Sequence, residues 1–63
     1  MFNGELLKKL REERELTRAK FAEMVDSTAH VINKYENGKK EPSIRMMCAI
    51  AEALGVPPAI FVS

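Results

Sequence analysis

Residues 16–38 have the sequence LTRAKFAEMVDSTAHVINKYENG, which predicts two short helices joined by a tight turn. Apolar residues recur at helical spacing over 18–25 and again over 29–36, with the pair Asp26-Ser27 between the two stretches. Asn37-Gly38 ends the second helix, because both residues tolerate the left-handed backbone of a helix C-cap. Two helices with so short a connection cross at about 90–120°, the arrangement called helix-turn-helix.

The sequence on either side of this stretch is also helical. We expect a first helix that ends near 13–15, a fourth helix over 44–54 that Gly55 ends, and a short helix or turn at the C-terminal end. No stretch alternates apolar and polar residues as a strand does. The predicted fold class is therefore all-α, a compact bundle of five short helices in a single domain over 1–63. Four residues are expected to cap the first four helices: Asn3, Thr17, Thr28 and Ser43.

The apolar residues of the last two elements predict both core and interface. The expected core stripe of the fourth helix is Ile44, Met47, Cys48, Ala51 and Leu54. Ile50 flanks this stripe, whereas Met46 falls off it, at the surface or in an interface. We interpret Cys48 as a small core residue rather than a sensor thiol. The C-terminal residues carry more apolar surface than a closing helix needs, so we assign a dimer interface to Pro57, Pro58, Ile60 and Phe61.

Length and composition exclude several classes of protein. Sixty-three residues are too few for a Rossmann fold, a TIM barrel or a kinase. One cysteine and one histidine make neither an internal disulfide nor a zinc site, so we expect no metal and no cofactor. The sequence has no nucleophile–base pair and no phosphate loop, so we expect a protein that is not an enzyme, and no small-molecule substrate is evident. It has no apolar run of the ~18 residues that a membrane span requires, and its free cysteine suits a reducing cytoplasm.

The second helix of the central pair has a polar outer face. Its apolar side is narrow and consists of Ala29, Ile32 and Tyr35. The remaining side chains supply donors and acceptors that suit the base edges of a DNA major groove. The formal net charge of the chain is only +1, but residues 16–40 contain five basic side chains against three acidic ones. Positive charge is thus concentrated around this helix, as a DNA-binding surface requires.

Four segments carry a more specific pattern: LTRAKFA at 16–22, INKYENG at 32–38, PSI at 42–44 and ALGV at 53–56. Over roughly residues 5 to 62, the chain resembles the phage-repressor/Cro and xenobiotic-response-element family of helix-turn-helix regulators. The resemblance implies a lambda-repressor-like domain whose helix-turn-helix lies at 17–37 and whose second helix, the recognition helix, enters the major groove.

The resemblance also implies roles for individual residues. Base-contacting positions on the recognition helix are Ala29, His30, Asn33 and Lys34. Phosphate-contacting positions are Thr17, Arg18, Thr28, Asn37, Lys39 and Lys40. Arg11 and Glu36 stand where family members form a partly buried ion pair that ties the first helix to the end of the recognition helix.

The chain departs from the family pattern at three positions, two of which are among those just named. Arg18 stands where glutamine is usual, and arginine holds a phosphate with more charge. Asp26 stands where glycine is common, so we expect a left-handed backbone there, which aspartate tolerates. Ala29 has no hydrogen-bonding group and offers only apolar contact, for example with a thymine methyl group.

Other interpretations stay open for the polar face. His30 is a solvated residue or a contact to base or phosphate, and Asn33 is an exposed helix residue or a bidentate partner of adenine. Lys34 is expected to meet a guanine or a phosphate, and Val31 is an apolar base contact or a neighbour of one.

Together these features predict a sequence-specific transcriptional regulator. The leading hypothesis is a repressor that binds a two-fold-symmetric operator in double-stranded DNA as a homodimer, although an activator would use the same surface. The alternative is a protein-binding adaptor or an antitoxin with the same fold. The modest net charge favours the adaptor, whereas the polar recognition helix and its flanking lysines favour DNA.

Overall fold

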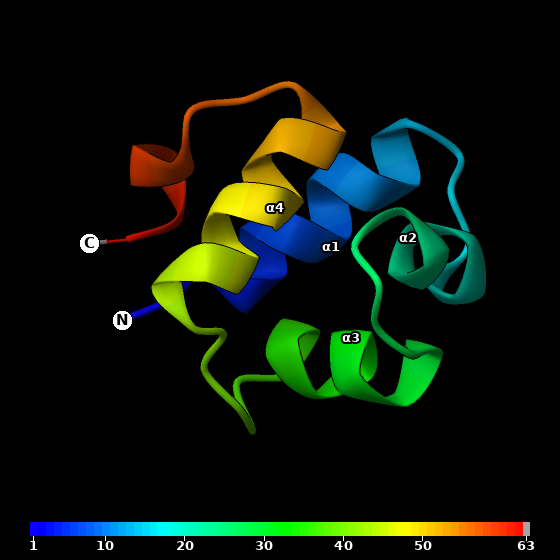
Figure 1. Ribbon diagram of the computed structural model, residues 1–63, viewed down its shortest axis with the longest axis horizontal. Helices are drawn as coiled ribbons and strands as arrows, with labels where there is room; N and C mark the ends of the chain where they lie inside the picture. The colour runs from blue at the N-terminus through cyan, green and yellow to red at the C-terminus, as the bar shows by residue number, and fades with distance from the viewer. Residues whose placement is uncertain (63) are drawn as a thin grey trace.

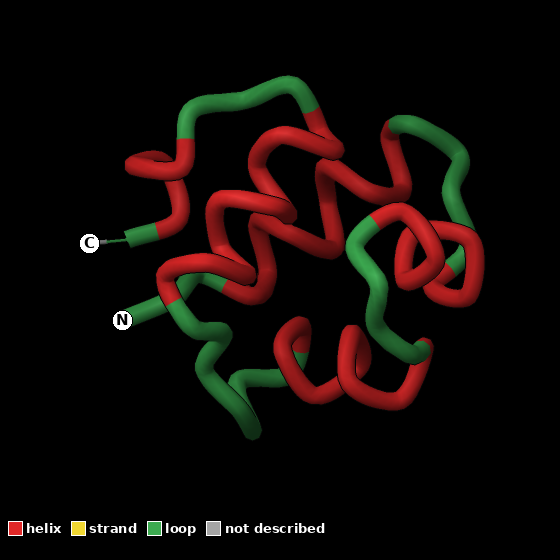
Figure 2. The backbone as a smooth tube through the Cα atoms, in the orientation of Figure 1, coloured by secondary structure: helices red, strands yellow, loops and turns green. Residues whose placement is uncertain are grey.

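The computed structural model describes residues 1–62 as four α-helices followed by one short 3-10 helix. The elements are α1 (Gly4–Glu13), α2 (Arg18–Met24), α3 (Ala29–Glu36), α4 (Ile44–Leu54) and η1 (Pro58–Phe61). Figure 2 shows helices joined by short loops, with no strand in the described part of the chain. The predicted all-α bundle is confirmed, with a 3-10 turn as the fifth element of the described residues. None of the helices described is both long and apolar enough to cross a membrane.

Each α-helix begins directly after the residue that the sequence predicts as its N-cap. In every case the side-chain oxygen accepts a hydrogen bond from the backbone N–H three residues further on, at 3.0–3.2 Å. The four caps are Asn3, Thr17, Thr28 and Ser43. Each such cap stabilises a helix by about 1 kcal/mol, which is a large contribution for helices of two or three turns.

Left-handed residues turn the chain between the helices. Asp26 has φ 55° in the turn between α2 and α3, as expected. Gly55 ends α4 with φ 73°, and Gly38 has φ 72°, whereas its neighbour Asn37 keeps φ −97°. Glu15 also has φ 55°, which the sequence pattern did not predict. The two non-glycine positions carry backbone strain that glycine would not have.

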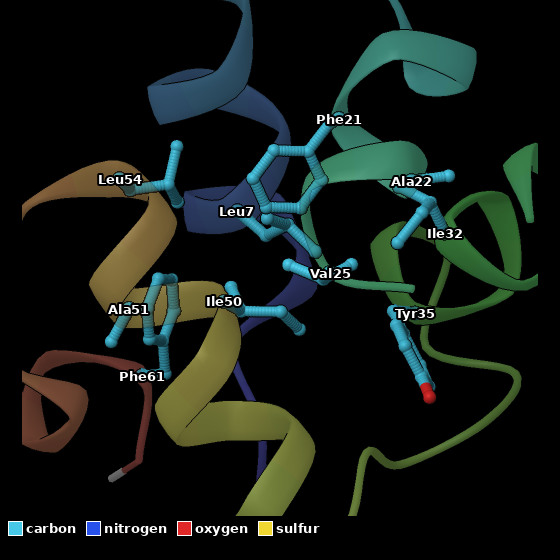
Figure 3. Packing of buried hydrophobic residues seen from close by; sticks show 10 residues of the cluster. All are labelled: Leu7, Phe21, Ala22, Val25, Ile32, Tyr35, Ile50, Ala51, Leu54 and Phe61. Atoms are coloured by element: carbon cyan, nitrogen blue, oxygen red, sulfur yellow. The ribbon is translucent and has the colours of Figure 1, made fainter. Parts of the chain in front are cut away.

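The hydrophobic core lies where all five elements meet (Figure 3). Its five largest fully buried side chains are Leu7, Phe21, Ile32, Ile50 and Phe61, one from each element. Burial of each such side chain contributes about 1.5–3 kcal/mol. Tyr35 borders this cluster with its hydroxyl oxygen turned away from it. Of α3, only the side that carries Ile32 and Tyr35 packs against the hydrophobic core.

The expected core stripe of α4 is wrong at two positions. Ile44 is 77% exposed and Cys48 is exposed, whereas Ile50, expected at the flank, is fully buried. Nearly every residue of α4 is apolar, so helical spacing fits more than one stripe. In the structure η1 packs on α4, and the buried face of α4 consists of Ile50, Ala51 and Leu54.

Two charged residues carry the signal that could have identified the outer face of α4. Arg45 and Glu52 are exposed, and Cys48 lies between them at helical spacing on the same face. Met46 and Met47, expected to differ, are both half-buried against the core.

The two ends of the described chain lie side by side (Figure 1). Phe2 forms an isolated antiparallel bridge with Val62, and the backbone N–H of Asn3 donates to the carbonyl of Phe61 at 2.6 Å. The Phe2 ring stacks on Phe61 with centroids 5.1 Å apart, and the Phe2 N–H donates to the Glu41 carboxylate at 3.1 Å. This contact closes the end of the bundle away from α2.

Phe61 is therefore wrong as an interface residue. Its ring is fully buried inside its own chain, because the core between α1 and α4 uses it. Of the other predicted interface residues, Pro57 and Ile60 are exposed and Pro58 is half-buried. These three remain on the surface, where a partner could contact them.

Candidate nucleic-acid interface

One side of α3 is polar and faces solvent at the edge of the molecule (Figure 1). The opposite side is buried and consists of Ile32, Tyr35 and Glu36. Four side chains on the solvent side recur at i, i+3, i+4 and i+7, so the helix backbone aligns them in one row. This polar row is His30, Asn33, Lys34 and Asn37. His30 and Asn37 are exposed, and the two central side chains are half-buried.

The predicted base-contacting residues occupy this row and its border. His30, Asn33 and Lys34 belong to the row itself. Ala29 is half-buried and precedes His30 by one residue, about 100° around the helix, so it borders the row. Val31 is on the other border and packs against the core. The row therefore presents two amides, one imidazole and one ammonium group, with a methyl group at its edge.

The predicted phosphate-contacting residues lie at helix ends around the row. Thr17 and Thr28 cap α2 and α3, and each hydroxyl still has its O–H to donate. Asn37 Nδ2 donates to the carbonyl oxygen of Asn33 at 2.9 Å, which holds that amide against the last turn of α3. Lys39 and Lys40 follow, and both are exposed.

A charged triad, Arg11, Arg18 and Glu36, lies behind the end of α3. The ion pair that the resemblance implies is present: Arg11 Nε donates to Glu36 Oε2 at 2.6 Å. Arg11 Nη2 reaches Glu36 Oε1 at 3.3 Å, and Arg11 Nη1 donates to the carbonyl oxygen of Leu16 at 2.6 Å. The Glu36 side chain is 0% exposed and that of Arg11 is 7% exposed, so the pair is more deeply buried than expected. Removal of one partner of such a pair costs about 3–5 kcal/mol.

Arg18 has a partner that sequence reasoning missed. Its Nε donates to Glu36 Oε1 at 2.9 Å, while its side chain remains 35% exposed. The bond joins the first residue of α2 to the last residue of α3, which no local pattern predicts. Within residues 1–62, no hydrogen bond uses the two terminal nitrogens of Arg18, so they stay open to an external acceptor.

Gly4 is a second residue that the predicted site lacked. A Cβ at this position would lie 2.8 Å from the carbonyl oxygen of Glu36 and closer still to that of Tyr35. The start of α1 therefore approaches the last turn of α3 more closely than any other residue type allows. The signal for this role was the presence of a glycine in the first turn of an otherwise good helix sequence.

Comparison with known proteins assigns this arrangement to a family. A family model described as Helix-turn-helix matches residues 7–61. The chain belongs to the helix-turn-helix family. It has the xenobiotic-response-element type of this fold, a DNA-binding domain that is usually not an enzyme.

Solved structures and a curated relative show where similar domains occur. The P22 c2 repressor, solved in complex with synthetic operator 9T, matches with a TM-score of 0.87 at 24% identity, over 92% of this chain and 88% of that chain. Hydroxypropylphosphonic acid epoxidase from S. wedmorenis matches with a TM-score of 0.82 at 30% identity, over 89% of this chain and 30% of that chain. Multiprotein-bridging factor 1 from Candida albicans is 34% identical over 53 residues, 84% of this chain and 35% of that protein. The domain thus also occurs as part of longer proteins, one of them an enzyme.

Proposed function

We propose that this helix-turn-helix domain, extending over 1–63, binds double-stranded DNA sequence-specifically and acts in a transcriptional repressor. The observation that carries the proposal is the polar row of α3, which is held from behind by the core and flanked by cationic residues. The P22 c2 repressor supports it, because a protein of the same fold was solved on an operator.

The size of α3 suits the major groove. An α-helix with its side chains is about 10–12 Å across, and the major groove is about 12 Å wide, so α3 fits into the groove with its polar row against the bases. Asn33 carries the amide that pairs in bidentate fashion with adenine, and Lys34 donates to guanine. His30 donates or accepts at a neighbouring base or phosphate, and the methyl group of Ala29 contacts a thymine methyl group. These four residues supply the sequence preference.

Phosphate contacts supply the remaining affinity. Arg18, Lys39 and Lys40 carry the positive charge, and Thr17, Thr28 and Asn37 add neutral donors. Each phosphate that a cation neutralises contributes about −0.9 to the slope of log affinity against log salt. Three cationic contacts therefore predict a slope of about −3 for one domain.

The regulator acts as a homodimer on a two-fold-symmetric operator. One domain of this size contacts few base pairs, so tight specific binding requires two half-sites. In this arrangement the two recognition helices enter successive major grooves about 34 Å apart. Pro57, Pro58 and Ile60 form the contact between protomers.

The experiment is a selection of random duplex DNA by the purified chain, together with its mass from sedimentation. An enriched palindrome with half-sites one helical turn apart, bound by a dimer, supports the proposal. Asn33→Ala or Lys34→Ala then lowers affinity for the selected site by about tenfold while affinity for random DNA changes little. The matched phosphate variant Lys39→Ala weakens both DNAs about equally. Equal losses on both DNAs for the α3 variants would overturn the assignment of base contacts.

A second candidate is a protein-binding adaptor or an antitoxin. Three exposed apolar side chains favour it: Ile44, Ile60 and Val62. The name multiprotein-bridging factor, carried by a relative, points in the same direction. A folded monomer that binds no DNA at low salt would favour this candidate over the repressor.

A further inference from the structure

We infer that Glu36 is a positioning residue for DNA: it holds the Arg18 guanidinium in the orientation in which its terminal nitrogens meet a backbone phosphate. This inference rests on the proposed function. It assigns a role in DNA binding to a buried carboxylate that does not itself contact DNA. Arg18 is thereby a clamp that joins the two helices of the motif and the DNA backbone.

The geometry divides the carboxylate of Glu36 between two arginines. Oε2 accepts from Arg11 Nε at 2.6 Å, and Oε1 accepts from Arg18 Nε at 2.9 Å and from Arg11 Nη2 at 3.3 Å. The Glu36 side chain is fully buried, so water does not compete for either oxygen. Fixing Nε fixes the plane of the Arg18 guanidinium, because that group is rigid and flat.

The charges of the triad do not cancel. Two guanidinium groups face one buried carboxylate, which leaves the triad one net positive charge, and the exposed Glu12 carboxylate adds a longer contact of 3.9 Å to Arg11 alone. Arg11 is almost fully buried, whereas the Arg18 side chain is 35% exposed. The surplus charge is therefore accessible at Arg18, beside the end of α3, where Asn37 completes the polar row and Lys39 and Lys40 follow. An anion that approaches this end meets a cation that is already in place.

Arginine is required for this double contact. Its Nε bonds Glu36 while the two terminal nitrogens stay available, so one side chain serves two acceptors in a fixed fork. A lysine carries the same charge on a single nitrogen at the end of a flexible stem. In the Arg18→Lys variant a single ammonium group on a flexible stem replaces the rigid fork, so a bond to Glu36 no longer orients separate donors toward a phosphate. The variant therefore separates positioning from charge.

Substitution of Glu36 gives a second test, in which net charge and positioning predict opposite changes in DNA affinity. Glu36→Gln makes the domain more positive by one charge, so simple electrostatics predicts tighter DNA binding. Positioning predicts weaker binding, because Arg18 loses the acceptor that orients it. In an Arg18→Gln background, Glu36→Gln is expected to cause no further loss of DNA affinity. A double-mutant cycle of these two substitutions measures this coupling.

The experiment measures binding of a labelled random duplex by fluorescence anisotropy over a range of salt concentrations. Arg18→Lys is expected to weaken binding about tenfold and to make the salt slope shallower by about 0.9, although the net charge is unchanged. Arg45→Lys, the same exchange at an exposed position of α4, leaves both quantities at their wild-type values. Arg18→Gln weakens binding more than Lys20→Gln, which removes one charge from an exposed position of the same helix.

The variants are compared at a temperature at which circular dichroism shows each of them folded. Arg18→Lys and Arg18→Gln carry the test even where Glu36→Gln does not fold. If the wild type binds duplex DNA and Arg18→Lys has the same affinity and the same salt slope, this inference is overturned while the proposed function stands. A wild-type chain that binds no duplex DNA at low salt overturns the proposed function together with it.

Discussion

Replacing Gly4 with alanine tests how α1 meets the recognition helix. Helix propensity alone predicts a gain in stability, because alanine is favoured over glycine by up to about 1 kcal/mol within a helix. The structure predicts a loss, because the new Cβ would lie 2.8 Å from the carbonyl oxygen of Glu36 and closer still to that of Tyr35. Both atoms belong to the backbone, so no side chain can rotate out of the way.

The expected loss is about 2 kcal/mol. Real Cβ atoms keep at least 3.0 Å from such neighbours, so α1 and the last turn of α3 must move apart. Forcing an extra methyl group into a packed contact costs about 1–3 kcal/mol, and a backbone obstacle belongs at the upper end of that range. The propensity gain offsets part of it. A 63-residue domain has only about 3–9 kcal/mol of total stability, so the variant loses a large share.

Urea unfolding followed by circular dichroism measures this loss directly. With a slope of about 1 kcal/mol per molar urea for a domain this small, the midpoint of Gly4→Ala falls by about 2 M. The control is Lys8→Ala, an exposed position of the same helix, which changes stability by at most about 0.5 kcal/mol. A Gly4→Ala midpoint equal to or above that of the wild type would refute the close approach of α1 to α3.

Three further predictions follow from burial and backbone conformation. Phe61→Ala lowers the free energy of unfolding by about 3–5 kcal/mol at every protein concentration, because Phe61 belongs to the core. Ile60→Ala lowers it by less than about 1 kcal/mol, but under the proposed function it reduces the fraction of dimer seen in sedimentation. Asp26→Gly raises the free energy of unfolding by about 0.5–1 kcal/mol through relief of its positive φ, while Asp26→Ala lowers it; a fall for the glycine variant would contradict the strain argument. Cys48 reacts with an aromatic disulfide reagent in the native state as fast as in urea, since it is exposed; protection until unfolding would place it in the core after all.

The features of this fold that the sequence predicts well are local ones. A capping hydroxyl and the N–H that it satisfies are three residues apart, so Thr17 and Thr28 identify the starts of α2 and α3 without tertiary information. The left-handed turn at Asp26 follows from the family pattern, in which glycine is common there. The polar row of α3 follows from helical spacing together with the narrow apolar side. Each of these depends on a short segment alone.

The features that the sequence did not predict depend on tertiary contacts. In α4 the apolar spacing allows several stripes, and only the packing of the whole bundle buries Ile50 rather than Ile44. Phe61 lies in a strongly apolar segment that is typical of an interface, but the structure buries its ring in the core of its own chain. The bond from Arg18 to Glu36 spans 18 residues and exists because α2 and α3 cross. No pattern within one helix contains that information.

The long-range contacts around the site converge on the last turn of α3. Gly4 abuts its backbone, and Arg11 and Arg18 share the carboxylate of Glu36. At the other end α3 is held by its Thr28 cap, a local contact. The polar row therefore takes its position from residues that lie outside it. Binding groups must be held to about 0.5 Å for accurate recognition. Under the proposed function, a change that loosens this turn weakens base discrimination as well as stability, even though the altered residue never touches DNA.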